Sequence, residues 1–263
     1  MTINIKNLFS YSKKISKMGD FQEVHHIEGL QVSSVSANLY KNRREDLSLF
    51  YFPEGANHAV AYTKNSVVSE SITWNRENTK NNVRALIVNT KNANTFTGNQ
   101  GLDSLNEIAK NLTDYLKKIE NENEYKKTKK KDLLFASTGV IGEEFPVEKI
   151  KTSIPNLVEN LRYNQNKLIW LKMASAIMTT DTKPKVASSQ IKIGDKVIRI
   201  SGIAKGSGMI APNLATMLSF IFTDADISSV ALNKFLNKVL SNTFNAITVD
   251  SDTSTNDMVA IFS

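Results

Sequence analysis

GIAKGSGMIAPNLATML, residues 202–218, is the stretch of this sequence that decides its fold. It contains four residues that set unusual limits on the backbone: Gly202, Gly206, Gly208 and Pro212. Glycine adopts conformations that other residues avoid and proline fixes φ, so we expect a fixed, irregular path beside a strand end. Lys205 lies among these glycines, but the G-x-x-x-x-G-K-[ST] order of a phosphate loop is absent, so a nucleotide site is not expected.

Regular elements flank this stretch on both sides. QIKIGDKVIRISGIA (190–204) predicts a β-hairpin, because Gly194 and Asp195 suit a two-residue turn with a positive φ at its first position. Residues 217–223 predict a strand. Residues 228–244 predict a helix whose inward face carries Leu232, Phe235, Leu236, Val239 and Leu240.

Strands are predicted between residues 30 and 68 and again at 83–90. Between residues 30 and 68, three short β segments are predicted by LQVSSVSANL, DLSLFYF and HAVAYT. VRALIVNT (83–90) is apolar enough throughout to be a buried central strand. KNANTFTGNQG (91–101) is too rich in Asn, Thr and Gly for a regular element and predicts a loop at the end of that strand.

Helices and one further strand follow. Ser104 and Glu107 form a capping-box pair, which predicts that an amphipathic helix begins there. DLLFASTGVIG (132–142) predicts a strand that runs into a turn. Residues 147–161 and 166–178 predict two more helices, the second apolar enough to be largely buried.

The composition bounds the class of protein. The chain has 263 residues, 41% of them hydrophobic and 22% charged, which fits one large globular domain or two modest ones. Cysteine is absent, so disulfides, zinc–thiolate sites and thiol nucleophiles are excluded. No run of about 18 apolar residues occurs, which predicts a soluble protein. Strands and helices are interspersed without the strict βαβ rhythm of a doubly wound sheet, and no internal repeat or linker divides the chain.

Charged and titratable residues give few functional signals. The net charge is +7, but only Lys126–Lys131 is a dense basic run, and we interpret it as a solvated turn or helix end rather than a nucleic-acid site. His25, His26 and His58 lack the spacing of metal ligands, so no metal is predicted. No G-x-S-x-G elbow marks a serine nucleophile, although spacing alone does not exclude a triad. Residues 1–20 are interpreted as a frayed extension.

Four separated motifs resemble, in the same order, segments of the ornithine acetyltransferase (glutamate N-acetyltransferase) family. They are STGVIGE (137–143), IMTTDTKPK (177–185), GIAKGSGMIAPNLATML (202–218) and ITVDSDTSTND (247–257). The first eighty residues match only loosely. The resemblance implies the family's layered α/β fold, with sheets packed between helices, related to self-processing N-terminal-nucleophile enzymes.

The resemblance implies that the chain cleaves itself. Thr216 falls on the family's nucleophile and Ala215 on the residue before the cleaved bond. Cleavage would leave residues 1–215 as an α chain and 216–263 as the start of a β chain. The family's remaining site residues, an acidic residue further downstream and a polar pair near the far C-terminus, have no counterpart before Ser263. We therefore expect a C-terminally truncated chain that does not turn over by itself.

The resemblance also assigns the binding positions. Thr138 and Gly139 fall on the oxyanion-hole pair, while Thr179, Lys205 and Thr216 fall on positions that bind the acyl-amino-acid substrate. The implied reaction is ping-pong transfer of an acetyl group from N2-acetylornithine to glutamate through an acyl-threonine. It requires no cofactor, and the motifs leave open whether acetyl-CoA is a co-substrate. The family implies two α and two β chains, arginine biosynthesis and a cytoplasmic location.

A threonine nucleophile needs a base. No histidine lies in these motifs, so the natural base is the α-amino group that cleavage creates on Thr216, with an ordinary pKa of about 7.7–8.0.

Departures from the family pattern keep alternatives open. Where the family typically has NSGNANACTG, this chain has NTKNANTFTG (89–98), so Lys91 replaces a glycine and Phe96 a small residue. IEGLQVSSVSANLY (27–40) also lacks the family's usual glycine and lysine. These changes bear more on specificity than on acyl transfer. The alternatives are a self-processing aminopeptidase or amidase, which generally presents serine, a nucleic-acid-binding protein and a catalytically inactive fragment.

Overall fold

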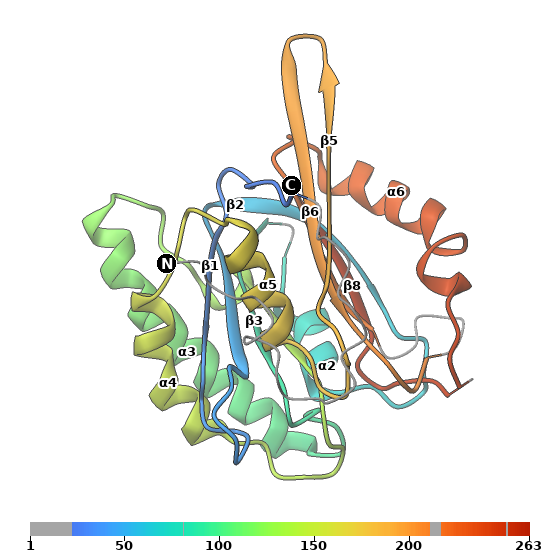
Figure 1. Ribbon diagram of the computed structural model, residues 1–263. Helices are drawn as coiled ribbons and strands as arrows, with labels where there is room; N and C mark the ends of the chain where they lie inside the picture. The colour runs from blue at the N-terminus through green and yellow to red at the C-terminus, as the bar shows by residue number, and fades with distance from the viewer. Residues whose placement is uncertain (1–22, 81, 211–216, 251) are drawn as a thin grey trace, which may run out of the picture.

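The computed structural model describes residues 23–80, 82–210, 217–250 and 252–263. Strands and helices alternate irregularly along these residues (Figure 1). In chain order the elements are β1 (Gln31–Val35), β2 (Leu47–Tyr62), α2 (Glu70–Asn78), β3 (Asn82–Asn89), α3 (Gly98–Glu122), η1 (Lys130–Asp132), β4 (Leu133–Ser137), α4 (Val147–Glu159), α5 (Lys167–Ala176), β5 (Lys185–Ile193), β6 (Lys196–Lys205), β7 (Leu218–Thr223), α6 (Ser229–Leu240), η2 (Phe244–Ala246) and β8 (Met258–Phe262).

All the strands of the described residues belong to one eight-stranded sheet. Its order is β4-β3-β2-β8-β7-β6-β5, and β1 pairs with β2 beside this path. The pairs β3–β4 and β7–β8 are parallel and the others are antiparallel. The sheet has two halves, one made by β1–β4 and the other by β5–β8. The long strand β2 takes part in both, because its first part pairs with β1 and β3 and its residues 58–62 pair with β8. A register shift between Tyr51 and Ala56 lets it pass from one half to the other.

The two halves of the sheet form the inner layers of the molecule. Aromatic rings join them: Phe50 of β2 stacks on Phe222 of β7 with centroids 5.0 Å apart, and Phe222 also stacks on Phe262 of β8. Trp170 of α5 packs against the same ring. On the outer faces, α3 and α4 cover the half made by β1–β4, and α6 covers β2 and β8 (Figure 1). This order confirms the predicted layered α/β fold.

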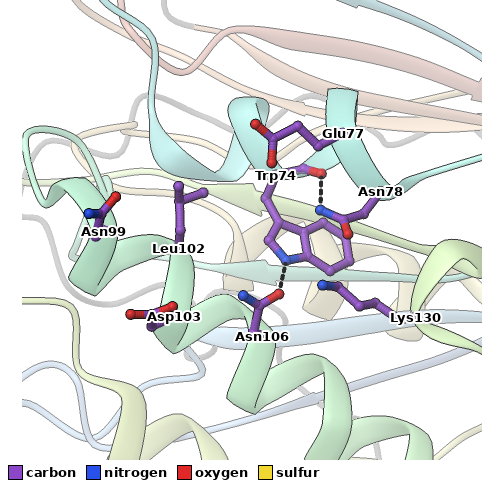
Figure 2. Close-up of a pocket in the computed structure, with 8 residues that line it drawn as sticks. All are labelled: Trp74, Glu77, Asn78, Asn99, Leu102, Asp103, Asn106 and Lys130. Carbon is purple, nitrogen blue, oxygen red and sulfur yellow. Dashed lines mark hydrogen bonds between the residues drawn. The ribbon is translucent and has the colours of Figure 1, made fainter.

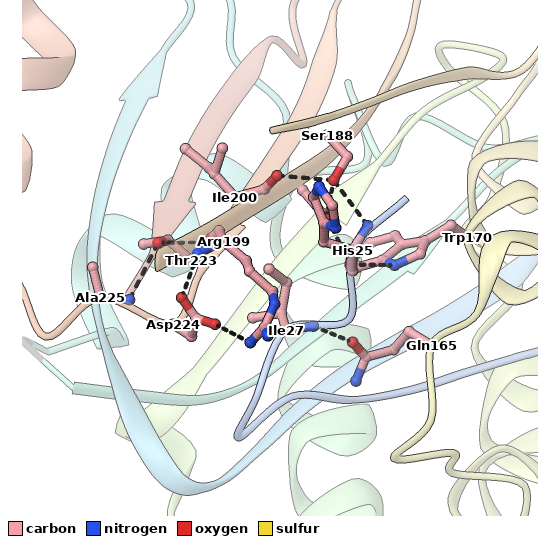
Figure 3. Close-up of polar contacts among 11 residues, drawn as sticks. His25, Ile27, Gln165, Trp170, Ser188, Arg199, Ile200, Thr223, Asp224 and Ala225 are labelled. Atoms are coloured by element: carbon pink, nitrogen blue, oxygen red, sulfur yellow. Dashed lines mark hydrogen bonds and ion pairs between the residues drawn. The ribbon is translucent and has the colours of Figure 1, made fainter. Parts of the chain in front are cut away.

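The segment before β1 is held against the hairpin of β5 and β6 (Figure 3). The His25 N–H donates to Ser188 Oγ at 2.9 Å, and the His25 carbonyl accepts from Ser201 Oγ and from Trp170 Nε1. The Ile27 N–H donates to the buried Gln165 side chain. The segment before β1 is therefore hydrogen-bonded to the half of the sheet that contains β5 and β6.

Most predicted elements are confirmed. The buried strand β3, the hairpin with Gly194 at φ 59°, and the helices α4, α5 and α6 lie within two to four residues of the expected ranges. Lys126–Lys131 spans the segment after α3 and the first two residues of η1, and its lysines are exposed while Thr128 is buried.

Three expectations are wrong, and two elements, α2 and β8, were not predicted. The second and third short β segments are one strand, β2. Helix α3 begins at Gly98, and Ser104 lies inside it, where its hydroxyl donates to the Gln100 carbonyl instead of capping the helix. On α6, Phe235 and Val239 are 56% and 44% exposed rather than inward-facing.

Candidate functional site

The turn after β4 holds the predicted oxyanion pair. Thr138 is buried, and its N–H donates to the Asn89 carbonyl at 3.1 Å. Gly139 has φ 138°, and a Cβ added there would collide with the Lys91 carbonyl group and lie 2.6 Å from the Asn92 N. Among the described residues, no partner is recorded for the Thr138 hydroxyl or the Gly139 N–H. The turn therefore presses on the loop after β3 with two donors available.

The loop after β3 shows what the two sequence departures do. Lys91 and Phe96 both have positive φ, 74° and 59°, a region that favours glycine. The Phe96 ring is 71% exposed and Lys91 forms an ion pair of 4.0 Å with Glu143. Both side chains point away from the core, so the loop keeps a path that smaller residues would also follow.

The predicted substrate-binding pair lies at the end of β6. Lys205 is only 3% exposed, and its Nζ donates to Thr179 Oγ1 at 3.2 Å. Burial lowers the pKa of the Lys205 ammonium, while the carboxylates of Asp181 and Asp257 oppose that change. The structure thus brings Thr179 and Lys205 together around a buried amine.

Asp181 holds the chain just after Lys205. Its Oδ1 accepts from the Gly206 N–H at 2.7 Å and from Lys185 Nζ at 2.5 Å. Burial disfavours the charged carboxyl, but the hydrogen bonds from Lys185 and Gly206 outweigh it and lower the pKa of Asp181. A carboxylate is therefore fixed beside the buried lysine.

The segment before β8 contacts the strand end that leads into the predicted oxyanion turn. Asn256 Nδ2 donates to the Ala93 carbonyl at 2.6 Å and to the Ser137 carbonyl at 2.8 Å, next to Thr138. Its Oδ1 accepts from Thr95 Oγ1 at 3.0 Å. One amide side chain therefore links the β3 loop and the end of β4 to the start of β8.

Asp257 follows directly and is 1% exposed. Its Oδ1 accepts from the Met217 N–H at 2.8 Å. Burial raises the pKa of this carboxyl to about 7, against hydrogen bonds from Met217 and Ser254 and the charge of Lys205. Sequence reasoning assigned no role to Asp181, Asn256 or Asp257, although each lies inside a quoted motif.

Aspartates hold the described residues on either side of the predicted cleavage site. Ala215 and Thr216 are outside the described residues. On one side, Asp250 accepts from the N–H groups of Met209 at 2.6 Å and Ile210 at 2.8 Å. On the other side, Asp257 accepts from Met217. The two carboxylates fix the chain at both ends of residues 211–216.

A separate pocket of about 350 Å³ lies elsewhere, between α2 and α3 (Figure 2). Trp74 forms part of its wall, with its Nε1 donating to Asn106 Oδ1 at 2.9 Å and Lys130 Nζ lying 5.6 Å from the ring centroid. None of the predicted site residues lines it. Within the described ranges, no group of three or more His, Cys, Asp or Glu could hold a metal ion, and no helix is long and apolar enough to cross a membrane.

The fold and this site place the chain in a class of proteins. An L-aminopeptidase D-Ala-esterase/amidase from Ochrobactrum anthropi, whose structure is described as a variant of the Ntn hydrolase fold, covers 92% of this chain at a TM-score of 0.52 and 9% identity. That identity shows a shared fold alone, and the class is therefore that of layered α/β proteins with the Ntn hydrolase arrangement.

Sequence comparison narrows the class to one family. The ArgJ family model matches residues 31–263, and the chain belongs to the ArgJ family. The arginine biosynthesis bifunctional protein ArgJ of Gluconobacter oxydans is 41% identical over 237 residues, which cover 90% of this chain and 53% of that protein. The ArgJ of Bartonella quintana is 38% identical over 252 residues, 95% of this chain and 58% of that protein. The chain thus spans a little over half the length of these relatives.

Two solved structures of ArgJ and ornithine acetyltransferase also match the fold of this chain. ArgJ from Bacillus halodurans matches with a TM-score of 0.62 and 28% identity, covering 73% of this chain and 92% of that one. Ornithine acetyltransferase from Mycobacterium tuberculosis, solved with ornithine, matches with a TM-score of 0.60 and 27% identity, covering 75% of this chain and 96% of that one.

Proposed function

We infer that this protein moves an acetyl group from N2-acetylornithine to glutamate through an acyl-Thr216 intermediate, after cleaving its own backbone between Ala215 and Thr216. The observation that carries the proposal is the buried Lys205–Thr179 pair in a chain of the ArgJ family. A buried ammonium beside a hydroxyl suits the carboxylate and amide of an acyl-amino acid. The relative solved with ornithine supports an ornithine-type substrate.

Self-cleavage would make the nucleophile and its base together. Thr216 Oγ bonds to the Ala215 carbonyl carbon, the bond from that carbon to the Thr216 nitrogen breaks, and the hydroxyl proton passes to the nitrogen. Water then hydrolyses the ester, which frees the Ala215 carboxyl group and restores the hydroxyl. The new α-amine, with an ordinary pKa of about 7.7–8.0, is the base for acyl transfer.

The turn after β4 supports the oxyanion role. Each half of the ping-pong reaction passes through a tetrahedral oxyanion. Among the described residues, neither the Thr138 hydroxyl nor the Gly139 N–H has a hydrogen-bond partner, so both can donate to that oxyanion. Loss of one such donor typically lowers the rate by about 10²- to 10³-fold. This turn packs so closely against the loop after β3 that a Cβ at Gly139 would meet the Lys91 carbonyl group.

The wider proposal concerns the whole protein. Residues 1–215 and 216–263 would belong to an α and a β chain, assembled two of each. No cofactor is required. Because the relatives are named bifunctional, we include acetylation of glutamate from acetyl-CoA as a second activity.

The test is the intact mass of the purified protein. We expect two pieces that meet at Ala215 and Thr216, and one uncut chain for Thr216→Ala. In the full-length protein, incubation with N2-acetylornithine should then add one acetyl group to the piece that begins with Thr216, and glutamate should remove it. Cleavage of Thr216→Ala at the same bond would contradict the nucleophile. Removal of the acetyl group by water alone would favour the aminopeptidase or amidase alternative.

A further inference from the structure

A second pocket lies where strand β2 passes from one half of the sheet to the other. Its volume is about 250 Å³. Strand β2 pairs with β3 as far as Asn57 and with β8 from His58 onward. The pocket is lined by this part of β2 together with residues of α2 and α6, and none of the predicted site residues lines it. The proposed acyl transfer therefore leaves this pocket without a role.

The charged side chains around this pocket all have the same sign. Arg76, Lys80 and His58 line it, and no aspartate or glutamate is among the described residues that do so. Neither Arg76 nor Lys80 forms an ion pair with a carboxylate within the described part of the chain. At neutral pH these two side chains are cations, so the pocket carries positive charge that the described residues do not neutralise.

The dipole of α2 accounts for only part of this charge. Arg76 lies in the last turn of α2, where a cation interacts favourably with the C-terminal end of the helix. Lys80 follows the C-cap residue Thr79, and His58 belongs to β2. Three basic side chains from two elements therefore share this pocket for a reason other than helix capping.

The wall formed by α2 is held in place. Asn75 Nδ2 donates to the Phe135 carbonyl at 2.8 Å, and Asn75 Oδ1 accepts from the Phe135 N–H at 2.9 Å. The Arg76 guanidinium lies over the Tyr62 ring, 5.5 Å from its centroid. Because these groups are already positioned, binding of a ligand to them would cost less conformational entropy.

The opposite wall is also fixed by hydrogen bonds. The His58 N–H donates to Ser229 Oγ at 3.2 Å, and Asn233 Nδ2 donates to the Ser229 carbonyl at 2.8 Å. The His58 ring stacks on Phe262, with ring centroids 6.4 Å apart. The start of α6 is thereby joined to β2 on the side of the pocket that faces α2.

We propose that this pocket binds the phosphate group of a small ligand. A phosphate monoester carries a charge of about −1.5 to −2 at pH 7, which matches the charges of Arg76 and Lys80. A guanidinium binds phosphate through paired hydrogen bonds, and a lysine adds a point charge. Val60 and Leu134 also line the pocket, so the organic part of a phosphate ester has apolar side chains to pack against. This binding site is independent of the proposed acyl transfer.

The test is isothermal titration calorimetry of the purified protein at constant ionic strength, with inorganic phosphate and with glycerol 3-phosphate. We expect saturable binding at one site per chain. Tighter binding of the ester would identify an organic phosphate as the ligand, and equal binding would identify free phosphate. Succinate, whose two charges lie on separate groups, should bind at least about fivefold more weakly. Equal binding of succinate would overturn the assignment to phosphate.

Variants test whether the named cations hold the phosphate. Arg76→Gln and Lys80→Met should each weaken binding by about threefold or more, and the double variant by about tenfold or more. Arg76→Lys keeps the charge and should bind phosphate more tightly than Arg76→Gln. Lys118→Met is the matched control, because Lys118 is an exposed lysine of α3 that does not line the pocket, and its affinity should be unchanged. Circular dichroism checks that each variant is folded.

Three results would overturn the phosphate site. They are the absence of saturable binding by the folded, unsubstituted protein, an unchanged affinity in the double variant, and equal losses in Lys118→Met and the double variant. Equal losses would mean that the net charge of +7, rather than this pocket, attracts the anion. The intact mass that tests the proposed function is a separate measurement, so either proposal can fail without the other.

Discussion

A buried carboxyl with a raised pKa makes the stability of the protein depend on pH. The ordinary pKa of an aspartate in an unfolded chain is about 3.9, whereas that of Asp257 in the folded chain is about 7. Between these values the folded chain binds one proton more than the unfolded chain. The contribution of Asp257 to the free energy of unfolding therefore falls as the pH rises through this window.

We predict that Asp257→Asn removes this dependence. In urea unfolding at a series of pH values, the unsubstituted chain should lose stability relative to the variant by on the order of 2 to 3 kcal/mol between pH 5 and pH 7. Parallel curves for the two proteins over this range would show that Asp257 ionises with an ordinary pKa.

Gly139 is predicted to tolerate no side chain. Gly139→Ala should lower the free energy of unfolding by more than about 2 kcal/mol, because φ 138° is strained for alanine and the new Cβ meets the Lys91 carbonyl group. Val140→Ala, in the same turn and 40% exposed, is the control and should cost less than about 1 kcal/mol. Equal losses in urea unfolding would mean that the close approach is unimportant.

The structure brings together some of the residues that the sequence motifs named and adds others that they did not. Lys205 and Thr179 were named from two different motifs and are in contact. Asn256 and Asp257 received no role because their partners lie far away in sequence. The Asn256 amide reaches a carbonyl 163 residues away, and no local pattern in a single sequence reports such a contact.

At the scale of elements, we predict that the hydrogen bonds of the Asn256 amide stabilise the contact between the two halves of the sheet. Asn256→Ala leaves the Ala93 and Ser137 carbonyls without this donor, so the free energy of unfolding should fall by about 2 to 4 kcal/mol. Asn160→Ala is the control, since its amide bonds only within the exposed end of α4. If Asn256→Ala and Asn160→Ala lower the free energy of unfolding by similar small amounts in chemical denaturation, the Asn256 hydrogen bonds do not have this role.

Prediction of elements followed local chemistry and failed where tertiary packing overrides it. The hairpin turn at Gly194 and the helix start at Ser228 depend on near neighbours and are confirmed. Strand β2 continues through Pro53 and Gly55, two residues that normally end a strand, because a bulge there lets it serve both halves of the sheet. Strand β8 was missed, since its five residues carry no turn signal.

For the whole molecule, the shared strand β2 predicts one cooperative unfolding transition. Trp74 lies in the core under α3 and α4, while Trp170 lies in the core between the two halves of the sheet. Alternate residues of β2 contribute to both cores, so neither can lose its packing alone. Each of the variants Trp74→Phe and Trp170→Phe keeps one tryptophan. In each variant, the midpoint of unfolding measured by fluorescence should equal the midpoint measured by circular dichroism. Separate midpoints would show that the two cores melt independently.

The strand order has one further consequence for a chain that is nicked once. Strands β7 and β8 come last in the sequence, yet they lie between β6 and β2, which come earlier. A break between residues 215 and 216 would therefore leave the shorter piece interleaved with the longer one, with hydrogen-bonded neighbours on both flanks. The two pieces would remain together as one folded molecule, and they would separate only when that molecule unfolds.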